Sequence, residues 1–318
     1  MRAPGFWSRP PGMVSALLAS LGALYARATA RRVARPGLRL GVPVICVGNL
    51  GAGGAGKTPT AMWLAGRIAG AHIVSRGHGG RLAGPVRVDP ARHSAADVGD
   101  EPLLLSAFAP VWVARDRAEG GRAAEAAGAR AVILDDGFQN PALVKDLSIV
   151  VVDAAAGFGN GRVIPAGPLR EPVAAGLARA DLVLAIGAGD VSVPDACPVL
   201  RGRLAPLATG MDWAGLPVFA FAGIGRPEKF FATLRELGCD IRGTEALADH
   251  QPLTPALLNR LGERAARLSA QPVTTEKDAV RLPAALRGHV MVVPVRLEID
   301  DAAPLVAALR GLGLTDPN

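Results

Sequence analysis

The feature that most constrains how this chain can fold is a glycine-rich motif, G-x-x-x-x-G-K-T, at residues 51–58. An apolar, β-branched run of strand length precedes it at 42–49, and a run with helical spacing follows it at 60–70. In this context the backbone N–H groups of the glycines surround phosphate oxygens, and the helix N-terminus adds its positive dipole. We therefore expect a nucleotide-binding loop, with Lys57 on the β- and γ-phosphates and the Thr58 hydroxyl on magnesium.

A pair of acidic residues follows a later strand signal. The apolar run 131–134 ends in Asp135 and Asp136. Because the carboxyl ends of parallel strands meet at one edge of a sheet, a carboxylate here can reach the magnesium ion of the phosphate loop. An isolated D-D-G string is more often a turn, so the metal prediction depends on the loop that precedes it. Together the two features predict binding of Mg-ATP or Mg-GTP.

The choice of nucleotide base depends on a weaker signal. GTPases usually carry an N-K-x-D string at a strand end, and this string does not occur in the sequence. The nearest string is T-T-E-K-D at 274–278, in which Lys and Asp are adjacent. The sequence therefore favours ATP.

Length and composition indicate two folded domains. The chain has 318 residues, of which 50% are hydrophobic and 20% charged, so it can bury a core in each of two domains. Strand and helix patterns alternate, which predicts an α/β fold with a mainly parallel, P-loop NTPase-like sheet flanked by helices. A segment rich in proline and glycine at 198–217 places the boundary near residue 205. We expect a phosphate-loop domain at 1–205 and a smaller α/β domain at 206–318.

Charge is distributed unevenly along the chain. The formal net charge is +7, but residues 1–88 contain eleven Arg, one Lys and no acidic residue. Such a block suits an acidic partner, which can be nucleic acid, an anionic membrane surface or a phosphorylated substrate. Few aromatic residues lie among these arginines, and no recognised nucleic-acid-binding module is visible. Nucleic acid is therefore not the expected partner.

A helix is predicted at 13–33, within this basic block. Its apolar part, 13–26, is shorter than the ~20 residues of a membrane-spanning helix, and arginines flank it on both sides. This arrangement is typical of a helix that lies in a membrane interface against anionic headgroups. Two alternatives stay open, a cleaved secretory signal and packing of the helix on its own domain. The bulky residues that share one stripe are Met13, Val14, Leu17, Leu18, Leu21, Leu24 and Tyr25.

Further polar clusters follow strand signals or precede helix signals, which is where ligands bind in open parallel sheets. In these clusters the sequence closely resembles the tetraacyldisaccharide 4'-kinases, the lipid A 4'-kinases of Gram-negative bacteria. The combination of D-D-G-F-Q with P-A-G-P-L-R-E-P makes the resemblance specific. The resembling strings keep the family's order, cover most of residues 40–282, and are VPVICVGNLGAGGAGKTP, SRGHGG, VGDEPLLL, ARDR, DDGFQ, GFGNGRVIPAGPLREP, FAGIGRPEKFFATL, ADHQPLT and TTEKDAVRL.

The resemblance implies a reaction and its setting. The γ-phosphoryl group of ATP would pass to the 4'-hydroxyl of an acylated glucosamine disaccharide 1-phosphate, which gives lipid IVA. ATP and Mg²⁺ would be the cofactors. The enzyme would act at the cytoplasmic face of the bacterial inner membrane, on an anionic surface and without an obligatory protein partner.

The resemblance also implies roles for individual residues. Asp100 would take the proton of the hydroxyl, and His250 would orient Asp100 and keep it ionised. Because the two residues lie in different expected domains, the site would lie in the cleft and closure would assemble it. The implied nucleotide or phosphate contacts are Gly51, Gly53, Gly54, Ala55, Gly56, Lys57, Thr58, Arg115, Arg117, Gln139 and Arg170. The implied magnesium contacts are Thr58, Glu101, Asp135 and Asp136.

The sequence departs from the usual family pattern at four positions. Family members usually have Thr at Ala55, Tyr at His78, His at Asn140 and a second His at Gln251. The change at Gln251 leaves His250 as the partner of Asp100, and Asn140 puts in doubt any role for a histidine beside the metal carboxylates. A competing hypothesis is a membrane-associated phosphate-loop ATPase or GTPase that uses hydrolysis as a switch or motor.

Overall fold

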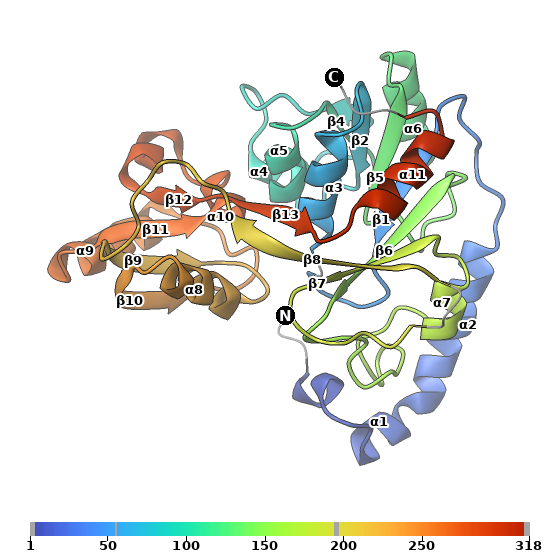
Figure 1. Ribbon diagram of the computed structural model, residues 1–318, viewed down its shortest axis with the longest axis horizontal. Coiled ribbons are helices and arrows are strands. Elements are labelled where there is room, and N and C mark those ends of the chain that lie inside the picture. The colour runs from blue at the N-terminus through green and yellow to red at the C-terminus, as the bar shows by residue number, and fades with distance from the viewer. Residues whose placement is uncertain (1–3, 55, 194–196, 315–318) are drawn as a thin grey trace.

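A nine-stranded sheet forms the larger part of the computed structural model, which describes residues 4–54, 56–193 and 197–314 (Figure 1). Neighbouring strands run parallel except at the two edges, where the outermost strand is antiparallel to its neighbour. The predicted mainly parallel α/β sheet is therefore confirmed. From edge to edge the strands are β13 (Val295–Ile299), β8 (Val199–Pro206), β7 (Leu182–Ile186), β6 (Leu147–Asp153), β1 (Val44–Gly48), β5 (Ala131–Asp135), β2 (Ala71–Ser75), β4 (Val111–Val113) and β3 (Val86–Arg87).

Helices cover both faces of this sheet. Successive side chains of a strand point to opposite faces, so in β1 Ile45 packs into one core while Cys46 packs into the other. Burial on both faces explains why these strands are continuous apolar runs. The first core is closed by α3 (Lys57–Ala65), α4 (Ala95–Val98), α5 (Asp100–Leu105) and α11 (Ala303–Gly311), and the second by α6 (Arg117–Ala126) and α7 (Val173–Leu177).

A second, four-stranded parallel sheet lies to the left in Figure 1. Its strands, in spatial order, are β10 (Asp240–Ala246), β9 (Pro217–Ala222), β11 (Gln271–Thr275) and β12 (Met291–Val293). One face packs on Phe230 and Phe231 of α8 (Pro227–Glu236), and the other packs on Leu258 and Leu261 of α9 (Pro255–Arg267). Two short helices, α10 (Glu276–Ala279) and η2 (Ala284–His289), lie between β11 and β12 along the chain.

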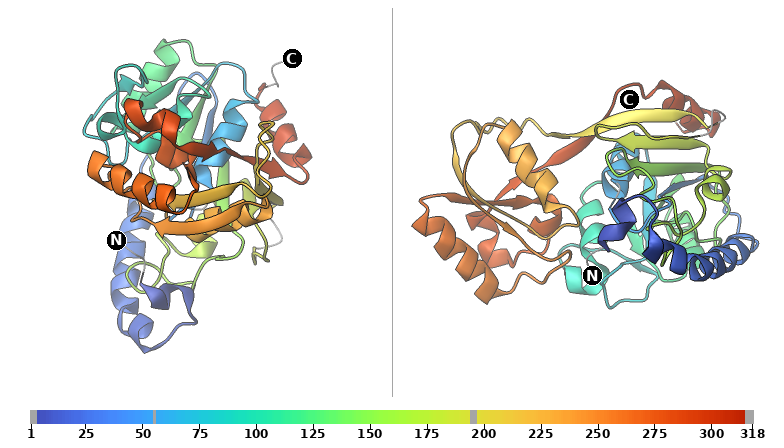
Figure 2. Two further views of the ribbon diagram at one scale, coloured as in Figure 1. Left: turned by 90° about the vertical axis from the view of Figure 1, so that its left-hand side faces the viewer. Right: turned by 90° about the horizontal axis from the view of Figure 1, so that it is seen from below.

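The chain crosses between the sheets twice, and the two crossings lie side by side. β8 and β13 pair as an antiparallel ribbon, and Figure 2 shows this ribbon leading to the small sheet. Beyond the ribbon the N–H of Leu207 still donates to the carbonyl of Pro294 at 2.9 Å. We call residues 207–294 the small domain, and the remaining described residues the large domain.

The division expected from composition differs from these sheets in one respect. The expected second domain runs from 206 to 318, but β13 pairs with β8 of the large sheet. Leu297 of β13 and Leu305 of α11 are buried in the core of the large domain. A short strand carries no local signal for the sheet that it joins, so its place depends on this long-range packing.

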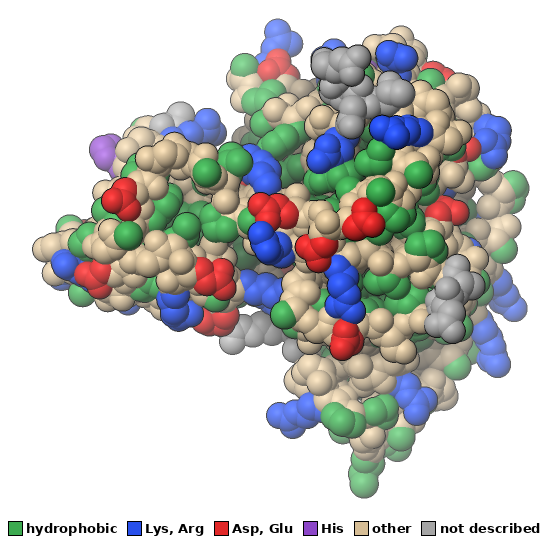
Figure 3. All heavy atoms as spheres, viewed as in Figure 1, with side chains coloured by type: hydrophobic (Ala, Val, Ile, Leu, Met, Phe, Trp, Pro, Cys, Tyr) green, Lys and Arg blue, Asp and Glu red, His purple; other side chains and the backbone are tan. Residues whose placement is uncertain are grey.

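The N-terminal helix is continued through a break at Leu18 as α1 (Met13–Leu17) and α2 (Ala19–Val33). Its small residues face the protein: a Cβ on Gly22 would come within 2.8 Å of the carbonyl oxygen of Val163. Its bulky stripe faces outward, since Met13 is 81% and Leu17 is 74% exposed. Hydrophobic side chains accordingly gather at the lower end of the molecule (Figure 3). The helix therefore packs on its own domain, as one alternative expected, but it does so through its small residues, and the bulky stripe stays exposed.

Among the described residues no helix is both long and apolar enough to cross a membrane.

Candidate active site

The phosphate loop joins the end of β1 to the start of α3, and its backbone admits only glycine at one point. Gly56 has a φ of 92°, and a Cβ there would lie 2.5 Å from Cδ1 of Ile186. The next residue, Lys57, begins α3. Its Nζ lies 3.6 Å from Oδ1 of Asp136 and 3.5 Å from the carbonyl oxygen of Gly53. The ammonium is therefore held over the loop, while Ala55 falls outside the described residues.

The proline-framed segment 163–172 is bound to the phosphate loop, because the N–H of Ala52 donates to the carbonyl of Pro168 at 2.7 Å. Arg170 donates to both carboxylate oxygens of Asp136, at 3.0 and 3.3 Å, and to Oε1 of Gln139 at 3.3 Å. Gln139 in turn donates to the carbonyl of Asn49 at 2.8 Å and to Glu171 at 2.9 Å. Burial acts to raise the pKa of Asp136, but Lys57 and Arg170 lower it overall. Asp136 is thus an ionised carboxylate between two cations.

Asp135 lies beside Asp136 but in the opposite electrostatic situation. Its side chain is buried, the Ser75 hydroxyl donates to Oδ2 at 3.0 Å, and Oδ1 has no hydrogen-bond partner among the described residues. Burial, followed by the charges of Glu101 and Asp136, raises the pKa of Asp135 to about 7. A buried carboxylate oxygen that accepts no hydrogen bond has lost its contacts with water, and no protein donor replaces them. This position therefore fits a cation.

Asp100 and His250 meet where the two domains touch. Asp100 begins α5 and is 4% exposed, and its Oδ2 lies 2.9 Å from Nδ1 of His250. The hydrogen bond to Asp100 is the largest cause of a raised pKa of His250. Burial acts to raise the pKa of Asp100, but His250 and nearby cations lower it overall. The pair can therefore take up and share a proton near neutral pH.

The backbone is strained at two of the predicted residues. Among the described residues three non-glycine residues have positive φ, and two of them are Asp136 at 52° and His250 at 58°. Such conformations persist where the surroundings enforce them, and they concentrate at functional sites. The backbone around His250 is held by Arg281. Its guanidinium donates to the carbonyl of Gln251 at 2.8 Å and to that of Gly223 at 3.1 Å.

Two of the predicted phosphate-binding arginines, Arg117 and Arg115, differ in their exposure. Arg117 is buried, and its guanidinium donates to the carbonyls of Ala114 at 3.2 Å and Asp135 at 3.3 Å. It therefore supports the backbone that presents Asp135. Arg115 is exposed at the end of β4, and its backbone N–H donates to Ala83. A string such as A-R-D-R does not reveal which of its arginines turns into the protein.

The positions that depart from the family pattern have local roles. The Asn140 side chain accepts a hydrogen bond from the N–H of Ala142, and the Gln251 side chain accepts one from the N–H of Ala248. Both therefore close turns. The His78 ring lies 6.0 Å from the His250 ring in an edge-to-face arrangement.

Lys277 and Arg281 join the site although sequence reasoning missed them. Lys277 lies 3.0 Å from Glu101, and Arg281 lies 3.9 Å from Asp100. The string TTEKDAVRL, which contains both residues, carries part of the family resemblance, but the sequence assigns neither Lys277 nor Arg281 a role in the site. The sequence offers no signal for a contact between residues 176 positions apart.

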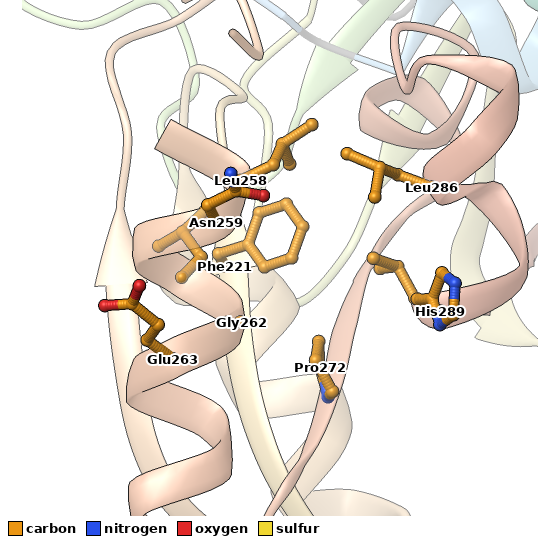
Figure 4. Close-up of a pocket in the computed structure, with 10 residues that line it drawn as sticks. Phe221, Leu258, Asn259, Gly262, Glu263, Pro272, Leu286 and His289 are labelled. Carbon is orange, nitrogen blue, oxygen red and sulfur yellow. The ribbon is translucent and has the colours of Figure 1, made fainter. Parts of the chain in front are cut away.

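A separate cavity of about 360 Å³ lies on the small domain, between α9 and η2 (Figure 4). Apolar side chains such as Phe221, Leu258 and Leu286 line it, with Glu263 and His289 beside them. None of the described residues that line it belongs to the predicted site.

A phosphate loop on a parallel sheet, an acidic strand end beside it and a carboxylate–histidine pair completed by a second domain define a phosphate-loop phosphotransferase. The particular family follows from comparison with known proteins. The family model of the tetraacyldisaccharide-1-phosphate 4'-kinases matches residues 14–312. The chain belongs to this family of kinases.

Individual relatives agree with this assignment over nearly the whole chain. The tetraacyldisaccharide 4'-kinase of Dinoroseobacter shibae is 63% identical, with 98% of each chain covered. That of Jannaschia sp. is 60% identical, with 97% of this chain and 98% of the relative covered. Among solved structures, LpxK from Aquifex aeolicus in complex with ATP is 25% identical, with a TM-score of 0.78 and coverage of 94% of this chain and 99% of that chain.

Proposed function

We propose that this chain transfers the γ-phosphoryl group of ATP to the 4'-hydroxyl of an acylated glucosamine disaccharide 1-phosphate, giving lipid IVA. Membership of the kinase family supports the reaction class. The observation that carries the proposal is the 2.9 Å contact between Asp100 and His250. A carboxylate paired with an imidazole is suited to take the proton of an attacking hydroxyl.

The nucleotide phosphates would lie against the backbone of 51–56 and the ammonium of Lys57. The ATP complex of the Aquifex aeolicus relative supports ATP as the nucleotide. Arg170, which already contacts Asp136 and Gln139, would together with Gln139 hold the phosphates in line with the acceptor. Positioning and charge stabilisation of this kind supply most of the catalysis of phosphoryl transfer.

The site can hold magnesium with only a few protein ligands. Asp135 offers a buried oxygen without a partner among the described residues, and Thr58 and Asp136 lie in the same part of the fold. No described group of three or more His, Cys, Asp or Glu side chains forms a metal site by itself, but Mg²⁺ bound with ATP needs only one or two protein oxygens, the others being phosphate and water. When bound, the ion would offset the negative charge of the β- and γ-phosphates.

Asp100 would take the proton of the 4'-hydroxyl as its oxygen attacks the γ-phosphorus. The bond from that phosphorus to the β,γ-bridging oxygen would break, and ADP would leave. His250 would share the proton through its bond to Oδ2 of Asp100. Because His250 belongs to the small domain and Asp100 to the large domain, separation of the domains would remove this pair.

Transfer of label from γ-labelled ATP to tetraacyldisaccharide 1-phosphate in mixed micelles tests the proposal. We expect label on the lipid at the 4' position. Label found only as inorganic phosphate, at the same rate with and without lipid, would contradict the proposal. That outcome would favour the competing hypothesis of a phosphate-loop ATPase.

The outward stripe of α1 and α2 supports binding to an anionic membrane surface, which we propose is the cytoplasmic face of the inner membrane. Leu21 and Leu24 continue the exposed stripe of Met13 and Leu17. Exposed arginines follow it at the end of α2, where anionic headgroups would meet them.

Replacement of Arg27, Arg31 and Arg32 together by Ala is expected to weaken binding to anionic vesicles about 100-fold, because each basic residue near such a surface contributes ~1 kcal/mol. Turnover on detergent-dispersed lipid should be unchanged, since these residues lie on α2 and outside the site. Vesicle flotation and the two activity assays measure both quantities.

A matched control removes three exposed arginines from the small-domain helices α8 and α9, namely Arg235, Arg260 and Arg267. It carries the same change of charge and should retain vesicle binding. Equal losses of binding in both triple variants would contradict a membrane role for α2.

A further inference from the structure

The T-T-E-K-D string, which does not serve as a base-recognition motif, builds the edge of the small domain that faces the site. The buried Thr274 hydroxyl donates to the carbonyl of Phe221 at 2.8 Å. Thr275 caps α10 by accepting from the N–H of Asp278 at 3.1 Å, and the fully buried Asp278 carboxylate accepts from the N–H of Gly223. Three of the five side chains thus fix the turn within the small domain.

The other two side chains of the string cross to the large domain. Glu276 accepts from the N–H of Val295 and from Arg296 in β13, at 3.2 and 2.7 Å, whereas Lys277 reaches the site. Its Nζ lies 3.0 Å from Oε1 of Glu101 and 3.5 Å from Nε2 of His250. The group facing His250 is the ammonium that lysine ordinarily carries near neutral pH, held here against the Glu101 carboxylate.

An ammonium in this place favours one position of the proton on the neutral His250 ring. Lys277 lies 3.5 Å from Nε2, closer than the Asp249 carboxylate at 3.7 Å. Lysine has only donors, so Nε2 must be the acceptor in the neutral ring. Nδ1 then carries the hydrogen and donates it to Oδ2 of Asp100, at the observed 2.9 Å. With the opposite tautomer, Nδ1 would present a lone pair to the carboxylate and Nε2 would present a hydrogen to the ammonium. Lys277 and Asp100 therefore favour the same tautomer from opposite sides of the ring.

The same ammonium also holds the residue next to the proposed base. Glu101 follows Asp100 at the start of α5, and its N–H donates to Oδ1 of Asp100 at 3.0 Å. An ion pair between Lys277 and Glu101 thus fixes the end of α5 against the small domain. Asp100 thus contacts the His250 ring and the N–H of Glu101, and the Lys277 ammonium contacts both of these residues.

We propose that Lys277 is a positioning residue for the phosphoryl transfer: it holds His250 in the tautomer with hydrogen on Nδ1 and holds Glu101 across the domain interface. It acts on Asp100 through these two residues. This inference rests on the proposed function, in which Asp100 is the base.

A second lysine of the small domain provides a matched control. Lys229, in the first turn of α8, lies 2.6 Å from Asp153 at the end of β6, and Arg226 also contacts Asp153 at 2.8 Å. Lys229 therefore joins the domains by an ion pair as Lys277 does, but contacts neither His250 nor Glu101. A role of Lys277 in domain attachment alone would make the two variants behave alike.

The kinetic test compares Lys277→Met with Lys229→Met. We expect Lys277→Met to lower kcat about 10- to 100-fold with little change in the KM for ATP, which is typical for loss of a residue that orients a functional histidine. Lys229→Met should keep kcat within about 3-fold, and Lys277→Arg, which retains a charged donor, should keep more activity than Lys277→Met. Equal losses for the Met variants at both positions would overturn the proposal.

A double-mutant cycle shows whether Lys277 acts through His250. In a His250→Ala background, Lys277→Met should lower kcat less than it does in the wild type, because the ring that it orients is absent. The same fold-loss in both backgrounds would overturn action through His250.

The tautomer itself can be observed in the protein with Lys277 in place, so this test does not need the Lys277 variants. A long-range ¹H–¹⁵N spectrum, recorded where the ring is neutral and assigned with His250→Gln, should show the His250 hydrogen on Nδ1. A hydrogen on Nε2 would overturn the inference. Failure of the wild type to phosphorylate the lipid would instead contradict the proposed function, and the spectrum is independent of that result.

Discussion

Replacement of Asp100 by Asn is expected to lower kcat for lipid phosphorylation by about 10²–10⁴-fold, the usual contribution of a general base. The amide keeps the size of the side chain but cannot accept a proton from the 4'-hydroxyl. Nucleotide binding depends on the phosphate loop and on Lys57, which the change does not touch. The affinity for ATP should therefore change little.

Steady-state assays with γ-labelled ATP measure kcat, and binding of a fluorescent ATP analogue measures affinity. Asp97→Asn is the matched control, because Asp97 lies three residues earlier and its side chain accepts hydrogen bonds from Ser94 and Arg81. We expect that control to retain kcat. A loss at Asp100 no greater than the loss at Asp97 would contradict the role of Asp100 as base.

The phosphate loop and the strand end at Asp135 could be found in the sequence because their chemistry requires neighbouring residues. Glycines, a lysine and a hydroxyl residue must follow one another between a strand and a helix to surround a phosphate. The conformation of Gly56, which leaves no room for a Cβ beside Ile186, is the physical reason for one of these glycines. Such constraints are local and leave a pattern in the chain.

The contacts between the domains leave no such pattern. Asp100 and His250 are 150 positions apart, and here only the family resemblance connected them before the structure did. Lys277 and Arg281 lie in a string whose other members fix a turn of the small domain, so composition alone does not separate the two functions. Arg117 shows the same limit, since its string does not reveal that this guanidinium is buried and donates to the carbonyl of Asp135.

Amphipathic patterns identify a stripe but not what the stripe faces. The bulky residues of α1 and α2 were predicted to share one side, and their exposure shows that the small residues, including Gly22, pack against the protein. The topology of β13 is a similar case, because alternation within five residues is compatible with either sheet. In both cases the packing partner of the segment is determined by residues far away in the sequence.

Replacement of Asp135 by Asn is expected to stabilise the ligand-free protein at alkaline pH. Its raised pKa of about 7, against about 3.9 in the unfolded chain, means that ionisation in the folded state is costly. Stability from the protonated carboxyl is fully present below the unfolded pKa and is lost as pH rises through 7. The variant should therefore gain on the order of 2–4 kcal/mol at about pH 8.5 and clearly less at about pH 5, while it loses activity with its metal-binding oxygen.

The neighbouring Asp136→Asn is the matched control, with the opposite sign. Lys57 and Arg170 lower the pKa of Asp136 overall, against the effect of burial, so its charge contributes stability above the unfolded pKa that is lost as pH falls. This variant should destabilise the protein at neutral and alkaline pH. Urea unfolding of both variants and the wild type, with a chelator present, measures the difference. Because the two carboxylates are adjacent in the chain, opposite effects on the free energy of unfolding can arise only from their different surroundings. A gain in stability from Asp135→Asn that is equal at both pH values would show that the charge of Asp135 is not its source.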